Sequence, residues 1–172
     1  MRIKAKISEL KTTADLVHEY RTRIRSRLSE FVGKLLQAGV QIASAKVYDM
    51  GAIDTGDLDS SIHYLISDDG KRGWIRADSD HAVYVEFGTG VKGAGAPHPN
   101  PPAGWVYDIN RHGQQGWWYP SDVADPNPYK RQDASGAWWA WTRGMPSRPF
   151  MFETATELAD QAVEVAKEVF RI

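Results

Sequence analysis

The chain has 172 residues, of which 42% are hydrophobic and 25% charged, as in ordinary soluble globular proteins. It contains no cysteine, which excludes disulfides, thiol catalysis and cysteine-ligated zinc. A chain of this length can bury a hydrophobic core without such cross-links. We expect a single domain over residues 1–172, with a core formed by 1–91 and 145–172 and an insertion at 92–144.

The charges are unevenly distributed along the chain. Residues 1–46 hold ten Lys/Arg and four Asp/Glu, whereas the remainder holds eleven and eighteen. This asymmetry favours contacts between unlike patches, including those of neighbouring copies. It does not resemble the basic surface of a nucleic-acid-binding protein, so we expect no sequence-specific nucleic-acid partner. No segment approaches the roughly 18 apolar residues of a membrane span, and the charged N-terminus lacks a signal core, so we expect a cytoplasmic protein without a membrane partner.

The spacing of apolar residues predicts a long amphipathic helix from Thr12 to about Tyr48. The apolar stripe consists of Leu16, Val17, Tyr20, Ile24, Leu28, Phe31, Leu35 and Ile42. Four arginines alternate beside it: Arg21, Arg23, Arg25 and Arg27. They could bind phosphate or an acidic partner, or they could form a solvated helix surface, and we favour the solvated surface.

The segment D-T-G-D-L-D-S-S-I begins at Asp54. Thr55 is predicted to cap one helical turn whose first position is Gly56, because its hydroxyl can accept a backbone N–H hydrogen bond. The triplet also matches that of aspartic peptidases, in which two aspartates share a proton. However, the sequence has one such triplet, and a helix precedes it in place of an apolar strand. Peptidase activity is therefore a remote alternative.

Three segments predict an antiparallel meander. Residues 61–67 and 72–77 form a hairpin around a D-D-G-K turn. Residues 81–90, H-A-V-Y-V-E-F-G-T-G, are rich in β-branched and aromatic residues and predict the third strand. Residues 137–143 are a candidate fourth strand. Within the third strand, Glu86 needs an ion-pair partner if it is buried, and we expect a structural pair with an arginine such as Arg76 or Arg148.

The insertion is rich in glycine, proline and tryptophan, and it is too long for an ordinary loop. Six of the seven tryptophans lie in it: Trp105, Trp117, Trp118, Trp138, Trp139 and Trp141. They could form a local core, a platform for sugar rings or an interface with another subunit. We favour a local core combined with a subunit interface, and carbohydrate binding is the second hypothesis.

The histidines give little indication of a metal site. His98 and His112 share the insertion with Asp108 and Asp122, but a position on the loop surface is the better interpretation. No residues combine a nucleophile, a base and an orienting group at readable spacing, so we expect no catalytic residues, no metal and no cofactor.

A C-terminal helix follows the insertion. Pro149 suits its first turn and Ser147 is a candidate cap. Its predicted apolar stripe consists of Ala155, Leu158, Ala159, Ala162, Ala166, Val169 and Phe170. The fold class is therefore α+β, with a long N-terminal helix, a three- to four-stranded antiparallel sheet and a C-terminal helix.

Three motifs in this order resemble a family of tailed-phage proteins: D-T-G-D-L-D-S-S-I, A-V-Y-V-E-F-G-T-G and R-P-F-M. The family comprises tail-component or head–tail joining proteins of siphophages and prophages. The motif residues are Asp54, Thr55, Gly56, Tyr84, Glu86, Gly88, Thr89, Arg148, Pro149 and Phe150. The resemblance implies a non-enzymatic virion protein of the tail or neck, assembled in the bacterial host cytoplasm. It also implies a role in tail completion or head–tail joining as an oligomeric ring, in contact with other tail or connector proteins.

Overall fold

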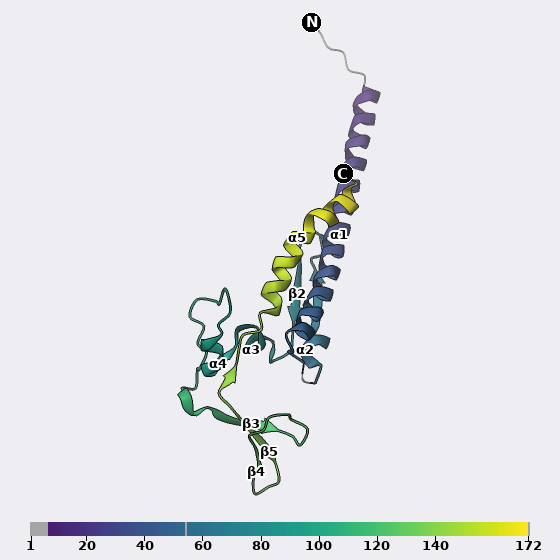
Figure 1. Ribbon diagram of the computed structural model, residues 1–172. Helices are drawn as coiled ribbons and strands as arrows, with labels where there is room; N and C mark the ends of the chain where they lie inside the picture. The colour runs from purple at the N-terminus through teal and green to yellow at the C-terminus, as the bar shows by residue number, and fades with distance from the viewer. Residues whose placement is uncertain (1–6, 54, 172) are drawn as a thin grey trace. The chain divides into compact units, whose positions relative to one another are not determined.

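The computed structural model describes residues 7–53 and 55–171 and confirms the α+β class (Figure 1). The described chain divides into two compact units. The first unit comprises residues 7–42, 63–76 and 157–171, and the second comprises 43–53, 55–62 and 77–156. No helix in the described ranges is long and apolar enough to cross a membrane.

In the first unit, two helices pack side by side. Helix α1 spans Ile7–Asp49, so the predicted long helix is confirmed and begins before Thr12. Helix α5 spans Phe150–Phe170, and its last residue packs against Phe31 with ring centroids 6.1 Å apart. Lys34 forms an ion pair with Glu168 near the same end of α5. These contacts place the C-terminal end of α5 beside the middle of α1.

Strands β1 (Ile62–Ile66) and β2 (Gly73–Ala77) form a hairpin that packs against α1. Ser67 donates its N–H to the Arg72 carbonyl, which closes the predicted turn. Gly39 of α1 allows this packing, because a Cβ there would lie 2.2 Å from Cδ1 of Ile75 and 3.1 Å from Cδ2 of Leu158. A mid-helix glycine costs roughly 1 kcal/mol relative to alanine, and here it permits close approach.

The predicted third strand is wrong. Residues 82–87 form helix α3 (Ala82–Phe87), and the hairpin remains a two-stranded sheet. The buried residues Ala82, Val85 and Glu86 are spaced by three and four, which is the helical period, whereas Val83 and Tyr84 are exposed. Over six residues, β-propensity was outweighed by the burial of one helical face. Gly88, at φ 77°, ends the helix.

The insertion has a sheet of its own. After α4 (Gly90–Gly95) and a 3-10 turn, η1 (Gly113–Gln115), come β3 (Trp117–Ser121), β4 (Lys130–Gln132) and β5 (Trp138–Thr142). They form an antiparallel sheet in the order β3-β5-β4. The strand predicted at 137–143 therefore exists, but it belongs to this separate sheet and is not a fourth strand of the predicted meander.

The two ends of the insertion are held together at its base. Short strand β6 (Gly144–Met145) faces residues 89 and 90 through two antiparallel bridges. Gly144 has φ 96°, and a Cβ there would lie 1.9 Å from the carbonyl oxygen of Thr89. The backbones meet this closely because the position is glycine.

Candidate functional site

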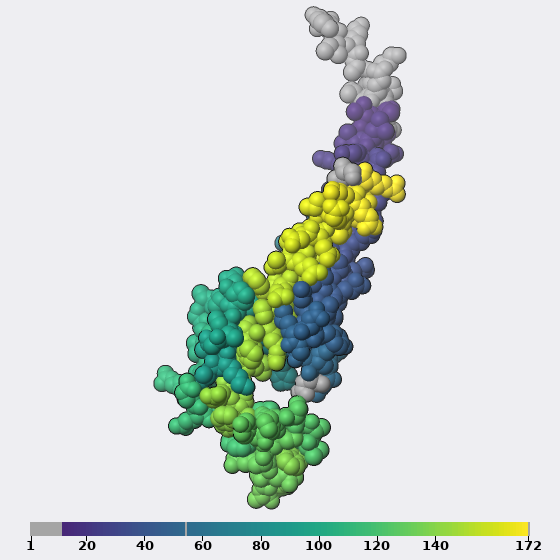
Figure 2. All heavy atoms as spheres, viewed as in Figure 1, coloured from purple at the N-terminus to yellow at the C-terminus, as the bar shows by residue number. Residues whose placement is uncertain are grey.

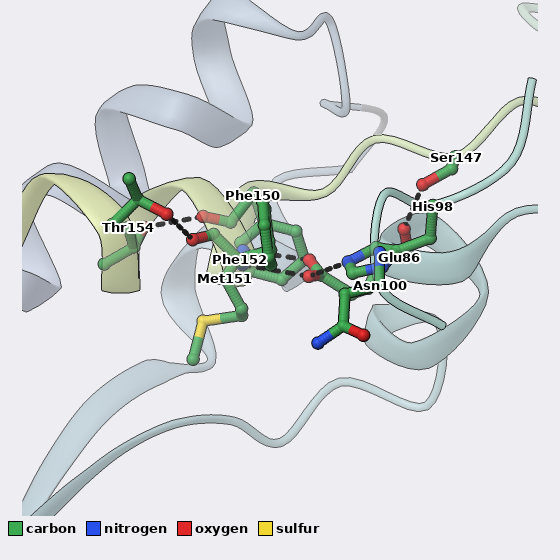
Figure 3. Close-up of polar contacts among 9 residues, drawn as sticks. Glu86, His98, Asn100, Ser147, Phe150, Met151, Phe152 and Thr154 are labelled. Atoms are coloured by element: carbon green, nitrogen blue, oxygen red, sulfur yellow. Dashed lines mark hydrogen bonds and ion pairs between the residues drawn. The ribbon is translucent and has the colours of Figure 1, made fainter. Parts of the chain in front are cut away.

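Glu86 lies at the centre of a buried polar junction in the second unit (Figure 3). The residue is only 7% exposed. Its Oε2 accepts the N–H of Met151 at 2.9 Å, and its Oε1 accepts the N–H of Phe152 at 3.0 Å. These N–H groups belong to the first turn of α5, which lacks carbonyl partners within the helix. Glu86 therefore caps α5 from another element, and its charge complements the positive end of the helix dipole.

His98 completes the junction. Its Nε2 lies 3.0 Å from Oε1 of Glu86, and its Nδ1 accepts the N–H of Asn100 at 2.9 Å. An accepting Nδ1 carries no proton, so this hydrogen-bond network assigns the proton to Nε2, which donates to the carboxylate. The ring packs between Phe87 and Phe152, at centroid distances of 4.7 and 5.3 Å. The contact is thus a buried hydrogen bond from a neutral imidazole to a carboxylate.

Three sequence predictions about this region are wrong. His98 is 5% exposed and does not lie on the loop surface. Within the described ranges, the side-chain partner of Glu86 is His98, through a hydrogen bond, in place of the predicted Arg76 or Arg148. Ser147 does not cap α5, because its hydroxyl donates to the carbonyl of Glu86. The predicted arginine pair assumed a strand at Glu86, whereas this residue lies in helix α3.

The junction joins two of the sequence motifs. The Arg148 N–H donates to the Val85 carbonyl at 2.8 Å, and the Thr89 hydroxyl accepts the Met145 N–H at 3.3 Å. A Cβ at Gly88 would lie 2.6 Å from the backbone nitrogen of Ser147. Phe150, which follows Pro149, is fully buried. These motif residues connect α3 to the start of α5, whereas the Tyr84 side chain remains exposed.

The D-T-G segment leads into the short helix α2 (Asp57–Ser60). Asp54 lies outside the described residues. The N-cap of α2 is Gly56, at φ 88°, and not Thr55 as predicted. The Thr55 hydroxyl still accepts the N–H of Asp57, at 3.3 Å, so it stabilises the turn before α2, which begins one residue later than expected.

The sheet of the insertion has one packed face and one aromatic face. Strand register places Trp118 opposite Trp141, and Pro120 opposite Trp139, which in turn faces Arg131 on β4. Side chains alternate along a strand, so these residues share one face. We define the aromatic face as Trp118, Pro120, Tyr129, Arg131, Trp139 and Trp141.

The aromatic face is organised by polar contacts at its borders. The Arg131 guanidinium lies 4.2 Å from the centroid of Trp118. The indole N–H groups of Trp139 and Trp141 donate to Asp133 and to the Gln115 carbonyl, both at 2.9 Å. Hydrogen bonds, first from the Ser135 hydroxyl and then from the Trp139 indole, lower the pKa of Asp133 to about 2. The rings of Trp139 and Trp141 are therefore fixed, and their indole N–H groups are already hydrogen-bonded.

The opposite face packs within the insertion. Ala140 is fully buried there, and Tyr119 and Ser121 both donate to Asp125. The remaining tryptophans are half-buried. Trp117 lies 4.7 Å from the ring of His112, Trp138 lies beneath the Lys130 ammonium, and Trp105 lies 4.9 Å from Phe87. The candidate interface tryptophans thus separate into Trp118, Trp139 and Trp141 on the aromatic face and Trp105, Trp117 and Trp138 inside the unit.

His112 and Asp108 are neighbours, as the shared insertion suggested. Nδ1 of His112 lies 3.1 Å from Asp108, which also accepts the N–H groups of Gly113 and His112. These hydrogen bonds, that of Gly113 first, lower the pKa of Asp108. Among the described residues, no three His, Asp or Glu side chains are arranged to hold a metal ion.

The N-terminal half of α1 presents an apolar surface to solvent. Leu16 and Tyr20 are each 60% exposed, and Ile24 is 42% exposed. We define the open stripe as Leu16, Val17, Tyr20 and Ile24. The candidate residues Arg21, Arg23 and Arg25 are exposed beside it, and Arg27 pairs with Glu30 at 3.0 Å. In Figures 1 and 2, α1 continues beyond the C-terminal end of α5.

Residues 17–88 match a protein-family model described as "Bacteriophage HK97-gp10, putative tail-component". This segment is similar to phage tail-component proteins. The resemblance predicted from the three motifs is thereby confirmed, and it supports a structural part in a phage tail. The match begins at the open stripe and ends at Gly88, before the insertion. No curated protein and no solved structure is significantly similar to the chain.

Proposed function

We propose that this protein is a structural component of a phage or prophage virion that acts in tail completion or head–tail joining. It does so as a homo-oligomer, of ring form, in contact with other tail or connector proteins in the tail or neck, after assembly in the cytoplasm of the bacterial host. The family match supports the structural role in a tail. The finer role in assembly rests on the exposed surfaces of the chain.

The open stripe is the observation that carries this proposal. Four large apolar side chains lie at helical spacing on α1, and no other described residue covers them. Burying one such side chain fully is worth about 1.5–3 kcal/mol. Contiguous exposed apolar surface of this kind is typical of protein–protein contacts. The stripe is thus explained by association.

The polar residues of the second unit support a non-enzymatic role. Glu86 and His98 are the buried acid and base that a catalytic hypothesis would use. Their carboxylate and ring nitrogens are occupied by backbone N–H groups and by each other. Thr55 and Gly56 form the entry to α2, which favours a structural role for the D-T-G triplet over peptidase activity.

Size-exclusion chromatography with light scattering tests this proposal. The purified protein is measured over a range of concentrations, alone and with tail-tube or connector proteins. We expect a defined oligomer and binding to at least one of these partners. A monomer at all concentrations that binds neither partner would contradict the proposal.

Carbohydrate binding is a second candidate, and the aromatic face is the observation that favours it. Trp139 and Trp141 lie on one sheet face with their indole N–H groups bonded at the border, so their rings are fixed. Fixed aromatic rings can stack against sugar rings. However, the Arg131 guanidinium already lies over Trp118. A shift of tryptophan fluorescence with a glycan from a panel would support this function, and no shift with any glycan would remove its support.

A further inference from the structure

The open stripe has the geometry of one ridge in a helix–helix contact. Leu16, Tyr20 and Ile24 are spaced by four residues, and such rows form the ridges that interdigitate when helices pack. The same row continues through Leu28 into the part of α1 that α5 covers. The surface that needs a partner is therefore an extension of an existing helix–helix interface.

Helix α5 of the same chain does not cover the open stripe. Phe170, the last residue of α5, packs against Phe31, and α1 continues N-terminally from there to Ile7. The stripe is seven or more residues before Phe31, which corresponds to roughly 10 Å or more of helix. A helix supplied by another molecule can extend the covered surface.

The outward face of α5 offers a complementary surface. Ala159 and Val163 are four residues apart and exposed, with Val163 at 59%, although Ala159 was predicted to lie in the apolar stripe of its helix. These two side chains form a short apolar row that the side chains of another helix can pack against. Asp160 and Glu164 are exposed beside this row, and Glu164 forms an ion pair with Lys167 at 2.7 Å. We define the outward face of α5 as Ala159, Asp160, Val163 and Glu164.

The charges of the two surfaces are also complementary. Helical spacing places Arg23 and Arg27 along one border of the open stripe and Arg21 and Arg25 along the other. The outward face of α5 carries the carboxylates of Asp160 and of Glu164, which also pairs with Lys167 of the same helix. Opposite charges at the borders of a contact favour the correct partner and register. Pairing the open stripes of two copies with each other would instead bring together the exposed Arg21, Arg23 and Arg25 of both copies.

We infer that the open stripe of one copy docks on the outward face of α5 of a second copy. This inference rests on the proposed homo-oligomer and names the surfaces that form it. Each copy contributes two different surfaces, so the contact is heterologous and can repeat from copy to copy until a ring closes. In this contact, the arginines beside the open stripe lie at its border and face the carboxylates of α5.

Disulfide cross-linking tests this inference, because the chain contains no cysteine. Tyr20→Cys and Val163→Cys are prepared as separate single-cysteine proteins, mixed in equal amounts and oxidised. We expect a disulfide-linked dimer in the mixture and little in either protein oxidised alone. Thr22→Cys is the matched control, because helical spacing places it away from the stripe, and it should not link to Val163→Cys.

Three results would overturn the inference. One is equal linkage by Thr22→Cys. Another is linkage of Tyr20→Cys or Val163→Cys with itself in place of the mixed dimer, which would indicate stripe-to-stripe or α5-to-α5 contact. The third is no mixed linkage although light scattering finds the oligomer, which leaves the proposed function intact and rejects only these surfaces. A wild-type protein that is monomeric at all concentrations would instead reject both.

Discussion

The two halves of helix α1 have the same apolar periodicity and opposite environments. In the C-terminal half, Ile42 is 8% exposed and Val47 is fully buried, whereas Ile24 in the N-terminal half is 42% exposed. The periodicity specifies which face of the helix is apolar, but not what covers it. The covered half stabilises the folded chain, and the open half is available for association. This difference can be tested by matched substitutions.

The largest change in the free energy of unfolding is expected for Ile42→Ala, with Ile24→Ala as its matched control. Removing buried methyl groups at Ile42 should lower the free energy of unfolding by about 2–5 kcal/mol. The same change at Ile24 should cost less than about 0.5 kcal/mol in a dilute monomeric sample. Urea denaturation at low protein concentration measures both. Equal losses at the two positions would show that the halves do not differ in this way.

A somewhat smaller loss of stability is expected for Glu86→Gln at the buried junction, with Glu19→Gln as its matched control. The amide introduced by Glu86→Gln cannot accept all three hydrogen bonds that the carboxylate accepts, and a buried donor left without a partner costs about 1–3 kcal/mol. Glu19 is exposed on the open half of α1, so its substitution should have little effect. Thermal unfolding followed by circular dichroism measures the difference. A junction variant as stable as the Glu19 variant would argue against capping of α5 by Glu86.

Thr55→Ala should have a more modest effect, because one hydrogen bond to Asp57 is lost at an exposed turn. We expect a loss of about 0.5–1 kcal/mol, and a smaller loss for Thr55→Ser, which keeps the hydroxyl. Urea denaturation of both variants beside the wild type measures this. If alanine and serine prove equally harmless, the hydroxyl does not stabilise the turn before α2.

The smallest effect on stability is expected from protonation of the Asp133 carboxylate in the insertion. This protonation should not change the environment of either half of α1. The pKa of Asp133 is about 2, below its ordinary value of 3.8, so the folded form is favoured above pH 3.8 and loses this contribution as the pH falls toward 2. Carboxyl carbon chemical shifts, measured by NMR against pH, should give Asp133 a midpoint of about 2. A midpoint at the ordinary value would contradict its hydrogen bonds to Ser135 and Trp139.

The sequence predicted the elements with long, strong periodicity. The extent of α1, the hairpin and α5 follow from regular apolar spacing and a turn signal, and the structure confirms them. The segment at residues 82–87 failed, because six residues fit either an alternating or a helical pattern, and tertiary burial decided between them.

The contacts of the junction could be predicted only in part. Burial of Glu86 and its need for a partner follow from its apolar neighbours, but the partner did not. His98 lies twelve residues away in a proline-rich segment without periodicity, so no local pattern connects it to Glu86. The exposure of Leu16 and Tyr20 was also not predictable, because periodicity cannot tell where the covering helix ends.

The central claim is that the open stripe is an association surface and not part of the folded core. Light scattering of the wild type and of Tyr20→Glu, at matched concentrations, tests it most directly. The account predicts an oligomer for the wild type and a monomer for Tyr20→Glu, with the same urea midpoint for the two monomeric chains at high dilution. The same oligomer mass for both proteins, or loss of folding in Tyr20→Glu, would contradict it.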